Sequence, residues 1–169
     1  GRGVGRYTIG LVRAMHESGA VVTVMNASKA DEQKWLDVIP SLQVAPFEPS
    51  TVRAASPDTW FMCTQMMLHP IPLDVVPRMI TEAGLRVVGI LHDVIPYRYP
   101  EQYLCDPSAL RQSQLRAVLV RTFDAMVANS TFSADTGSPV LDFNRSQIHV
   151  VGAAVEPQFC EGLVSESRL

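Results

Sequence analysis

Short apolar runs alternate along this chain with longer segments in which apolar residues recur every three or four positions. The short runs are rich in β-branched and aromatic residues, and they predict strands at residues 20–25, 58–64, 86–91, 125–128 and 148–151. The periodic segments predict helices at about residues 5–16, 30–39, 76–83 and 107–121, and one from residue 131 that is interrupted at 137–139. Four prolines between residues 40 and 57 predict a loop with at most a short strand at 42–45. The alternation is typical of an α/β fold: a Rossmann-like, doubly wound parallel sheet with helices on both faces.

The strongest strand pattern is the continuous apolar run that ends at Leu91. Such a run predicts a strand that is buried on both faces. It is followed at once by His92 and Asp93, and then by Pro96 and Pro100, which predict a loop rather than a helix. Ligands of open α/β sheets bind at the carboxyl ends of the strands, so His92 and Asp93 are candidate site residues. The alternative is structural, with His92 a satisfied strand-end histidine and Asp93 the cap of a turn.

Two further polar groups are expected at the same edge of the sheet. The opening residues GRGVGR place glycines ahead of a helix, where backbone N–H groups attract anionic ligands. They do not form a nicotinamide-cofactor fingerprint, because Arg6 stands in place of the third glycine and Asn26 in place of an acidic residue after the next strand. The second group, at residues 129–131, supplies helix N-cap residues. The alternative for the glycine-rich opening is a simple tight turn, and the alternative for residues 129–131 is simple helix capping.

The position of the glycine turn also predicts a gap in the sheet. A glycine-rich turn into a helix normally follows a strand, and in a doubly wound sheet that first strand is central. The sequence in hand begins at Gly1. We therefore expect two inner strands with unpaired backbone between them, filled by residues before Gly1 or paired with another chain.

Composition limits the class of protein. The 169 residues suffice for one sizeable core, and 47% hydrophobic with 18% charged residues is the composition of a globular domain. A net charge of −3 gives no footprint for nucleic acid. Three widely separated cysteines and four scattered histidines predict reduced thiols and no metal site. The sequence contains neither an apolar run long enough to span a membrane nor an opening signal peptide.

Four segments of the chain are similar to one family. GVGRYTIGLVRAM (3–15) resembles the first loop and helix of family 4 glycosyltransferases, a GT-B group that is mostly nucleotide-sugar dependent and retaining. LHDVIPYRYPEQYL (91–104) resembles the HDLIPLxYPE segment of a bacterial branch, many of whose members are mannosyl- or rhamnosyltransferase-like. VANSTFSADT (127–136) is similar to VSEFSRRD in that family. IHVVGAAVEPQF (148–159) is similar to IxVVPNGVDPxF, although Gly-Ala-Ala replaces Pro-Asn-Gly.

The resemblance implies the N-terminal, acceptor-side domain of a two-domain GT-B enzyme. The domain would span residues 1–155, and 156–169 would begin the interdomain linker. The whole enzyme would transfer a hexose or deoxyhexose, of mannosyl or rhamnosyl type, from a nucleotide-sugar donor to a saccharide or lipid-linked acceptor, with retention. Such a reaction belongs to cell-envelope polysaccharide biosynthesis. Most donor contacts in the family come from the C-terminal domain, which this chain does not contain, so we expect the chain alone to be inactive.

The resemblance also assigns roles to seven residues: catalytic for His92 and Asp93, and donor-phosphate or substrate binding for Gly3, Gly5, Arg6, Ser130 and Ser133. The glycines and Arg6 would face the donor phosphates. His92 would lie beside the transferred sugar and the acceptor hydroxyl. The two serines would match those at the start of the helix that follows the family's sixth strand.

The implied partners are the donor, the acceptor and the C-terminal domain of the same enzyme. No cofactor or metal is expected, because helix N-termini and basic side chains stabilise the leaving diphosphate. The expected location is cytoplasmic. A peripheral contact with the inner face of the membrane and a strand-mediated dimer stay open. The alternative to an enzyme is a non-catalytic Rossmann-like module that binds a ligand or a protein.

Overall fold

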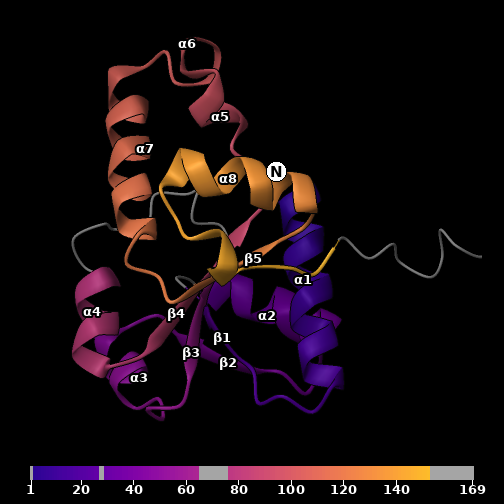
Figure 1. Ribbon diagram of the computed structural model, residues 1–169. Coiled ribbons are helices and arrows are strands. Elements are labelled where there is room, and N and C mark those ends of the chain that lie inside the picture. The colour runs from indigo at the N-terminus through magenta and orange to yellow at the C-terminus, as the bar shows by residue number, and fades with distance from the viewer. Residues whose placement is uncertain (1, 27–28, 65–75, 153–169) are drawn as a thin grey trace, which may run out of the picture.

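Strands and helices alternate through most of the computed structural model, which describes residues 2–26, 29–64 and 76–152 (Figure 1). The strands are β1 (Thr23–Asn26), β2 (Gln43–Pro46), β3 (Trp60–Cys63), β4 (Arg86–Leu91), β5 (Ala125–Ala128) and β6 (Ile148–Val150). The longer helices are α1 (Arg2–Glu17), α2 (Lys29–Val38), α4 (Val76–Ala83), α7 (Pro107–Val120) and α8 (Thr131–Leu141). Single turns or short helices form α3 (Pro49–Arg53), α5 (Ile95–Arg98), α6 (Pro100–Tyr103) and the 3₁₀ turn η1 (Arg145–Gln147).

All strand pairs are parallel, which confirms the predicted α/β class. Four strands form one sheet in the order β3-β4-β5-β6, and β1 pairs with β2 in a second sheet. β4 is an inner strand, with Gly89 opposite Cys63 on one side and Met126 on the other. Among the described residues no ladder joins the two sheets. This split is what a gap between two inner strands would produce.

Each sheet has its own hydrophobic cluster. The larger cluster surrounds the four-stranded sheet and includes the fully buried Leu91, Met126 and Leu141. The smaller one lies between α1 and the two-stranded sheet, around Val12, Ile39 and Leu42. Side chains connect the two clusters: Met25 of β1 and Phe47, directly after β2, pack against the larger cluster.

Several predicted elements have the expected bounds, among them 76–83, 86–91 and 125–128. The first helix, predicted from about Gly5, begins earlier: α1 already starts at Arg2, so the expected glycine loop ahead of it is helical. A glycine in a helix costs only about 1 kcal/mol relative to alanine, and packing of the rest of α1 outweighs that cost. The predicted loop after Asp93 is also wrong. Pro96 and Pro100 stand in the first turns of α5 and α6, where a missing N–H has no consequence.

Two other segments are more helical than their prolines and glycines suggest. α3 was not predicted; Pro49 opens it and it buries Val52 completely. α8 runs without the predicted interruption, from the Ser130 cap to the left-handed Asp142 (φ 52°). Gly137 lies inside α8 where a methyl group would overlap the Leu91 side chain, so the glycine serves close helix–strand packing. The predicted linker at 156–169 lies outside the described residues.

Candidate functional site

His92 lies at the carboxyl end of β4, where three other elements meet it. Its half-buried imidazole packs edge-to-face against Tyr7 of α1, with ring centroids 5.2 Å apart and an interplanar angle of 84°. Its Nε2 is 3.4 Å from the carbonyl oxygen of Thr64, directly after β3. The carbonyl of His92 accepts a 2.8 Å hydrogen bond from the Ser133 hydroxyl of α8. The histidine is thus held from α1, β3 and α8 together.

The two predicted serines lie close to this histidine through α8. Ser130 is the N-cap: its Oγ accepts a hydrogen bond from the Ser133 N–H at 3.0 Å. The two hydroxyl oxygens are 3.0 Å apart, and Ser133 is buried. Capping fixes the start of α8, and Ser133 then ties that start to the end of β4. The serines therefore support the backbone that carries His92.

Asp93 is placed differently from its neighbour. Its carboxylate is exposed, and Oδ1 accepts a 3.0 Å hydrogen bond from the Ile95 N–H at the start of α5. That geometry matches the turn-capping alternative. Oδ2 has no contact assigned among the described residues, so a catalytic role for Asp93 stays a prediction.

The glycines and Arg6 lie in the first turns of α1 rather than in a loop. Because Tyr7 contacts His92, these turns begin at the same edge of the sheet. Packing does not explain Gly5: a Cβ there would meet nothing within 4 Å, and its φ is not in the left-handed region. Arg6 is exposed. Open space beside Gly5 and a cation next to it suit the approach of an anionic group from outside the domain.

Sequence reasoning missed Tyr7. Its spacing places it on the same helix face as Leu11, Ala14 and Met15, and its side chain is half-buried. Its hydroxyl donates to the Gly152 carbonyl at 3.4 Å, and burial raises the pKa of the phenol above its usual value. The sequence did offer one indication of its role: a tyrosine stands among the aliphatic residues of a helix face, and a buried phenol needs a polar partner. Asn129, from the predicted polar group at residues 129–131, has a buried Oδ1 without a hydrogen-bond partner in the described part of the chain.

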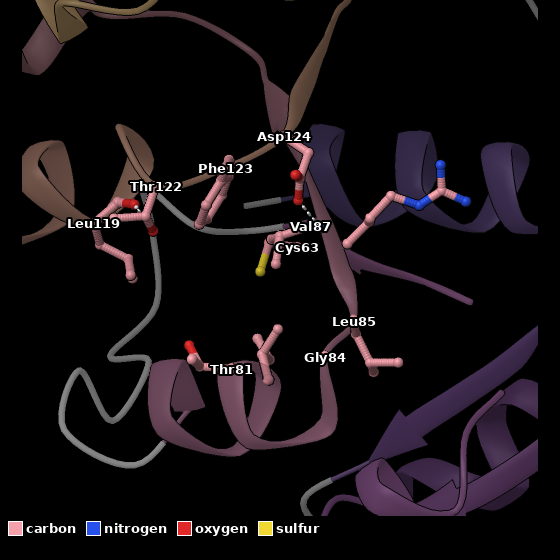
Figure 2. A pocket seen from close by; sticks show the side chains of 11 residues that line it. Cys63, Thr81, Gly84, Leu85, Val87, Leu119, Thr122, Phe123 and Asp124 are labelled. Atoms are coloured by element: carbon pink, nitrogen blue, oxygen red, sulfur yellow. Dashed lines mark hydrogen bonds between the residues drawn. The ribbon is translucent and has the colours of Figure 1, made fainter. Parts of the chain in front are cut away.

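A cavity of about 350 Å³ lies beside the start of β4 and the end of α4 (Figure 2). Its lining includes Arg86 and Val87, which begin β4, and Asp124, whose carboxylate accepts a 2.7 Å hydrogen bond from the Val87 N–H. β4 rises about 3.3 Å per residue, so this cavity is separated from His92 by most of the strand's length. Cys63 also lines it, and burial raises the pKa of that thiol to about 12. The cavity is therefore not part of the site at the strand ends.

Within the ranges that the structure describes, no three His, Cys, Asp or Glu side chains gather in a group that could hold a metal ion. In those same ranges, none of the helices combines the length and apolar character needed to cross a bilayer.

A parallel sheet with flanking helices and polar groups at the carboxyl ends of its strands defines a Rossmann-like ligand-binding domain. Residues 1–159 match the model of Glycosyltransferase Family 4, and the chain belongs to that family. Neither the curated proteins nor the solved structures contain a match. The chain is therefore a domain of a glycosyltransferase.

Proposed function

We propose that this chain is the acceptor-side half of an enzyme that transfers a hexose or deoxyhexose from a nucleotide-sugar donor to a saccharide or lipid-linked acceptor, with retention. The observation that carries the proposal is the family match over residues 1–159 together with the meeting of α1, β4 and α8 at His92. The transfer needs no cofactor and no metal in this proposal. The enzyme acts in the cytoplasm in cell-envelope polysaccharide synthesis.

The donor diphosphate approaches the first turns of α1. The first N–H groups of a helix have no partner within the helix, so together with the helix dipole they favour negative charge, and Arg6 adds a full positive charge beside them. Internal packing does not require glycine at position 5, which supports a donor-facing role for Gly5, and the proposal gives Gly3 the same role. Charge that develops on the leaving diphosphate is stabilised here.

His92 contacts the transferred sugar and the acceptor hydroxyl. Its ring is half-buried and held by neighbours on several elements, so it offers a hydrogen-bonding group in a fixed place. Fixed placement is what a positioning or proton-accepting group requires. Ser130 and Ser133 contribute by holding the backbone of His92, and Asp93 holds the turn that follows it.

A second domain, facing this one across the cleft, supplies most donor contacts. The isolated chain is therefore inactive, since one wall of the charge-stabilising site is missing. Robust sugar transfer or donor hydrolysis by the 169-residue chain would contradict this part of the proposal.

The central test uses the two-domain enzyme and a panel of nucleotide sugars. His92→Ala should lower kcat by about 100-fold or more, the usual contribution of a positioned proton-transfer group. His149→Ala is the matched control, because that histidine is exposed on β6 of the same sheet and should leave the rate unchanged. A His92→Ala enzyme with the wild-type rate would refute the assignment, and a panel without any accepted donor would refute the substrate class.

A further inference from the structure

Tyr7 is the residue through which α1, the end of β4 and the chain after β6 contact one another. Its ring packs on His92 and its hydroxyl reaches the carbonyl of Gly152. We propose that Tyr7 is a positioning residue: together with the Thr64 carbonyl it holds the His92 imidazole in one orientation and one tautomer, with Nδ1 as the lone-pair nitrogen. The use of that lone pair in sugar transfer rests on the proposed function, whereas the orientation and the tautomer do not.

The tautomer follows from the contact at Nε2. A carbonyl oxygen can only accept a hydrogen bond, so the 3.4 Å contact with Thr64 requires a hydrogen on Nε2. In a neutral imidazole the other ring nitrogen, Nδ1, then has no proton and carries an available lone pair. The Thr64 carbonyl therefore decides which nitrogen can accept a hydrogen bond or a proton from a ligand.

The orientation follows from the contact with Tyr7. The two rings meet at 84°, an edge-to-face arrangement that rotation of the imidazole would break. The tyrosine ring is itself held at its far end, because its hydroxyl donates to Gly152. Gly152 has a φ of +77°, a backbone conformation that glycine adopts readily, so the residue that carries this carbonyl is unstrained. A tyrosine hydroxyl is protonated at neutral pH at its ordinary pKa of about 10, and burial raises the pKa of Tyr7 further.

The arrangement gives Tyr7 two separable functions. The ring restrains His92, and the hydroxyl restrains the ring relative to the segment that leaves β6. Tyr7→Phe removes only the second function, and Tyr7→Leu removes both. This separation distinguishes positioning of the histidine from a general contribution to stability.

The test is long-range ¹H–¹⁵N correlation NMR on the 169-residue chain labelled at histidine nitrogen, at mildly alkaline pH. The His92 signals are assigned by their loss in His92→Gln. The wild-type chain should show the cross-peak pattern of the Nε2–H tautomer and ring-current-shifted His92 protons. Tyr7→Phe should preserve both features, and Tyr7→Leu should give a mixture of tautomers without the ring-current shift. Tyr103→Leu, at an exposed tyrosine, is the control that should change neither.

Two results would overturn the proposal. One is an Nδ1–H tautomer, or a mixture, in the wild-type chain. The other is a Tyr7→Leu chain whose His92 signals equal those of the wild type. If Tyr7→Leu does not fold, the wild-type and Tyr7→Phe spectra still decide the tautomer and the ring contact. Because no step measures sugar transfer, failure of the proposed function would leave these spectra unchanged and would be recognised separately.

Discussion

Replacement of Gly137 by alanine tests whether close approach of α8 to β4 builds the site. Gly137 is buried in α8, and the three atoms nearest to an added methyl group all belong to Leu91. Leu91 is fully buried and cannot move its side chain into solvent. The methyl group must therefore either force Leu91 into another rotamer within the core or push α8 and the end of β4 apart.

The expected magnitude is the difference between two effects. Overpacking of a core costs about 1–3 kcal/mol, while replacing a helical glycine by alanine returns up to about 1 kcal/mol. Gly137→Ala should therefore lower the free energy of unfolding by about 1 kcal/mol, or about 2–4 °C in Tm for a chain of this size. Gly10→Ala gives the helix term alone, because a Cβ at Gly10 would meet nothing within 4 Å. The difference between the two variants isolates the packing cost.

Urea unfolding of the single variants and of the pair Gly137→Ala with Leu91→Val provides the assay. Valine lacks the δ-methyl groups that the new Cβ would strike, so the second substitution should relieve the cost by about 1 kcal/mol in a double-mutant cycle. Amide spectra should also show perturbation at Ser133, one turn earlier in α8, whose hydroxyl binds the His92 carbonyl. A Gly137→Ala chain that gains as much stability as Gly10→Ala, without coupling to Leu91, would refute the reasoning.

Three further predictions follow from the structure. Gly5→Ala and Gly10→Ala should each stabilise the chain by up to about 1 kcal/mol. Only Gly5→Ala should weaken nucleotide-sugar binding by the two-domain enzyme, measured by calorimetry. Equal binding by both variants would contradict a donor-facing Gly5. In a chain with Cys105→Ser and Cys160→Ser, the buried Cys63 should resist alkylation at pH 8, and rapid labelling of the folded chain would contradict this. Because the folded state keeps the thiol protonated to higher pH than the unfolded state, the free energy of unfolding should fall as the pH rises from about 9 to about 12. In the described residues β1 and β3 each have an unpaired edge, so light scattering should detect dimers or larger species of the 169-residue chain. A clean monomer would contradict strand pairing between chains.

The sequence predicted the parts of the fold that depend on local patterns. The apolar run of β4 and the periodicity of α4 defined those elements correctly, because burial on both faces or on one face leaves a direct trace in the sequence. The errors occur where tertiary contacts override local preference. Proline suggested a break after Asp93, yet it opens a helical turn there, and Gly137 suggested an interruption where the chain needs room for Leu91.

The candidate site was predictable in location but not in detail. Strand ends of a parallel sheet meet at one edge, which is why His92 and Ser133 could be expected near each other. The contact of Tyr7 with His92 depends on how α1 is placed over the sheet, and no spacing in the sequence encodes it. Whether a polar side chain caps a turn, as Asp93 does, or faces a ligand likewise depends on backbone directions that only the folded chain defines.

The division of the sheet into two ladders has a consequence for folding cooperativity. Each ladder has its own hydrophobic cluster. Among the described residues no backbone ladder joins the two, and they are connected by side chains such as Met25, Phe47 and, from α1, Tyr7. The β1–β2 unit with α2 should therefore open as a subglobal unit at lower free energy than the four-stranded sheet. Native-state hydrogen exchange should show amides of β4 and β5 protected beyond those of β1 and β2. A central strand bonded to both β1 and β3 would join the two units, so the folding of this half of the enzyme would become a single transition.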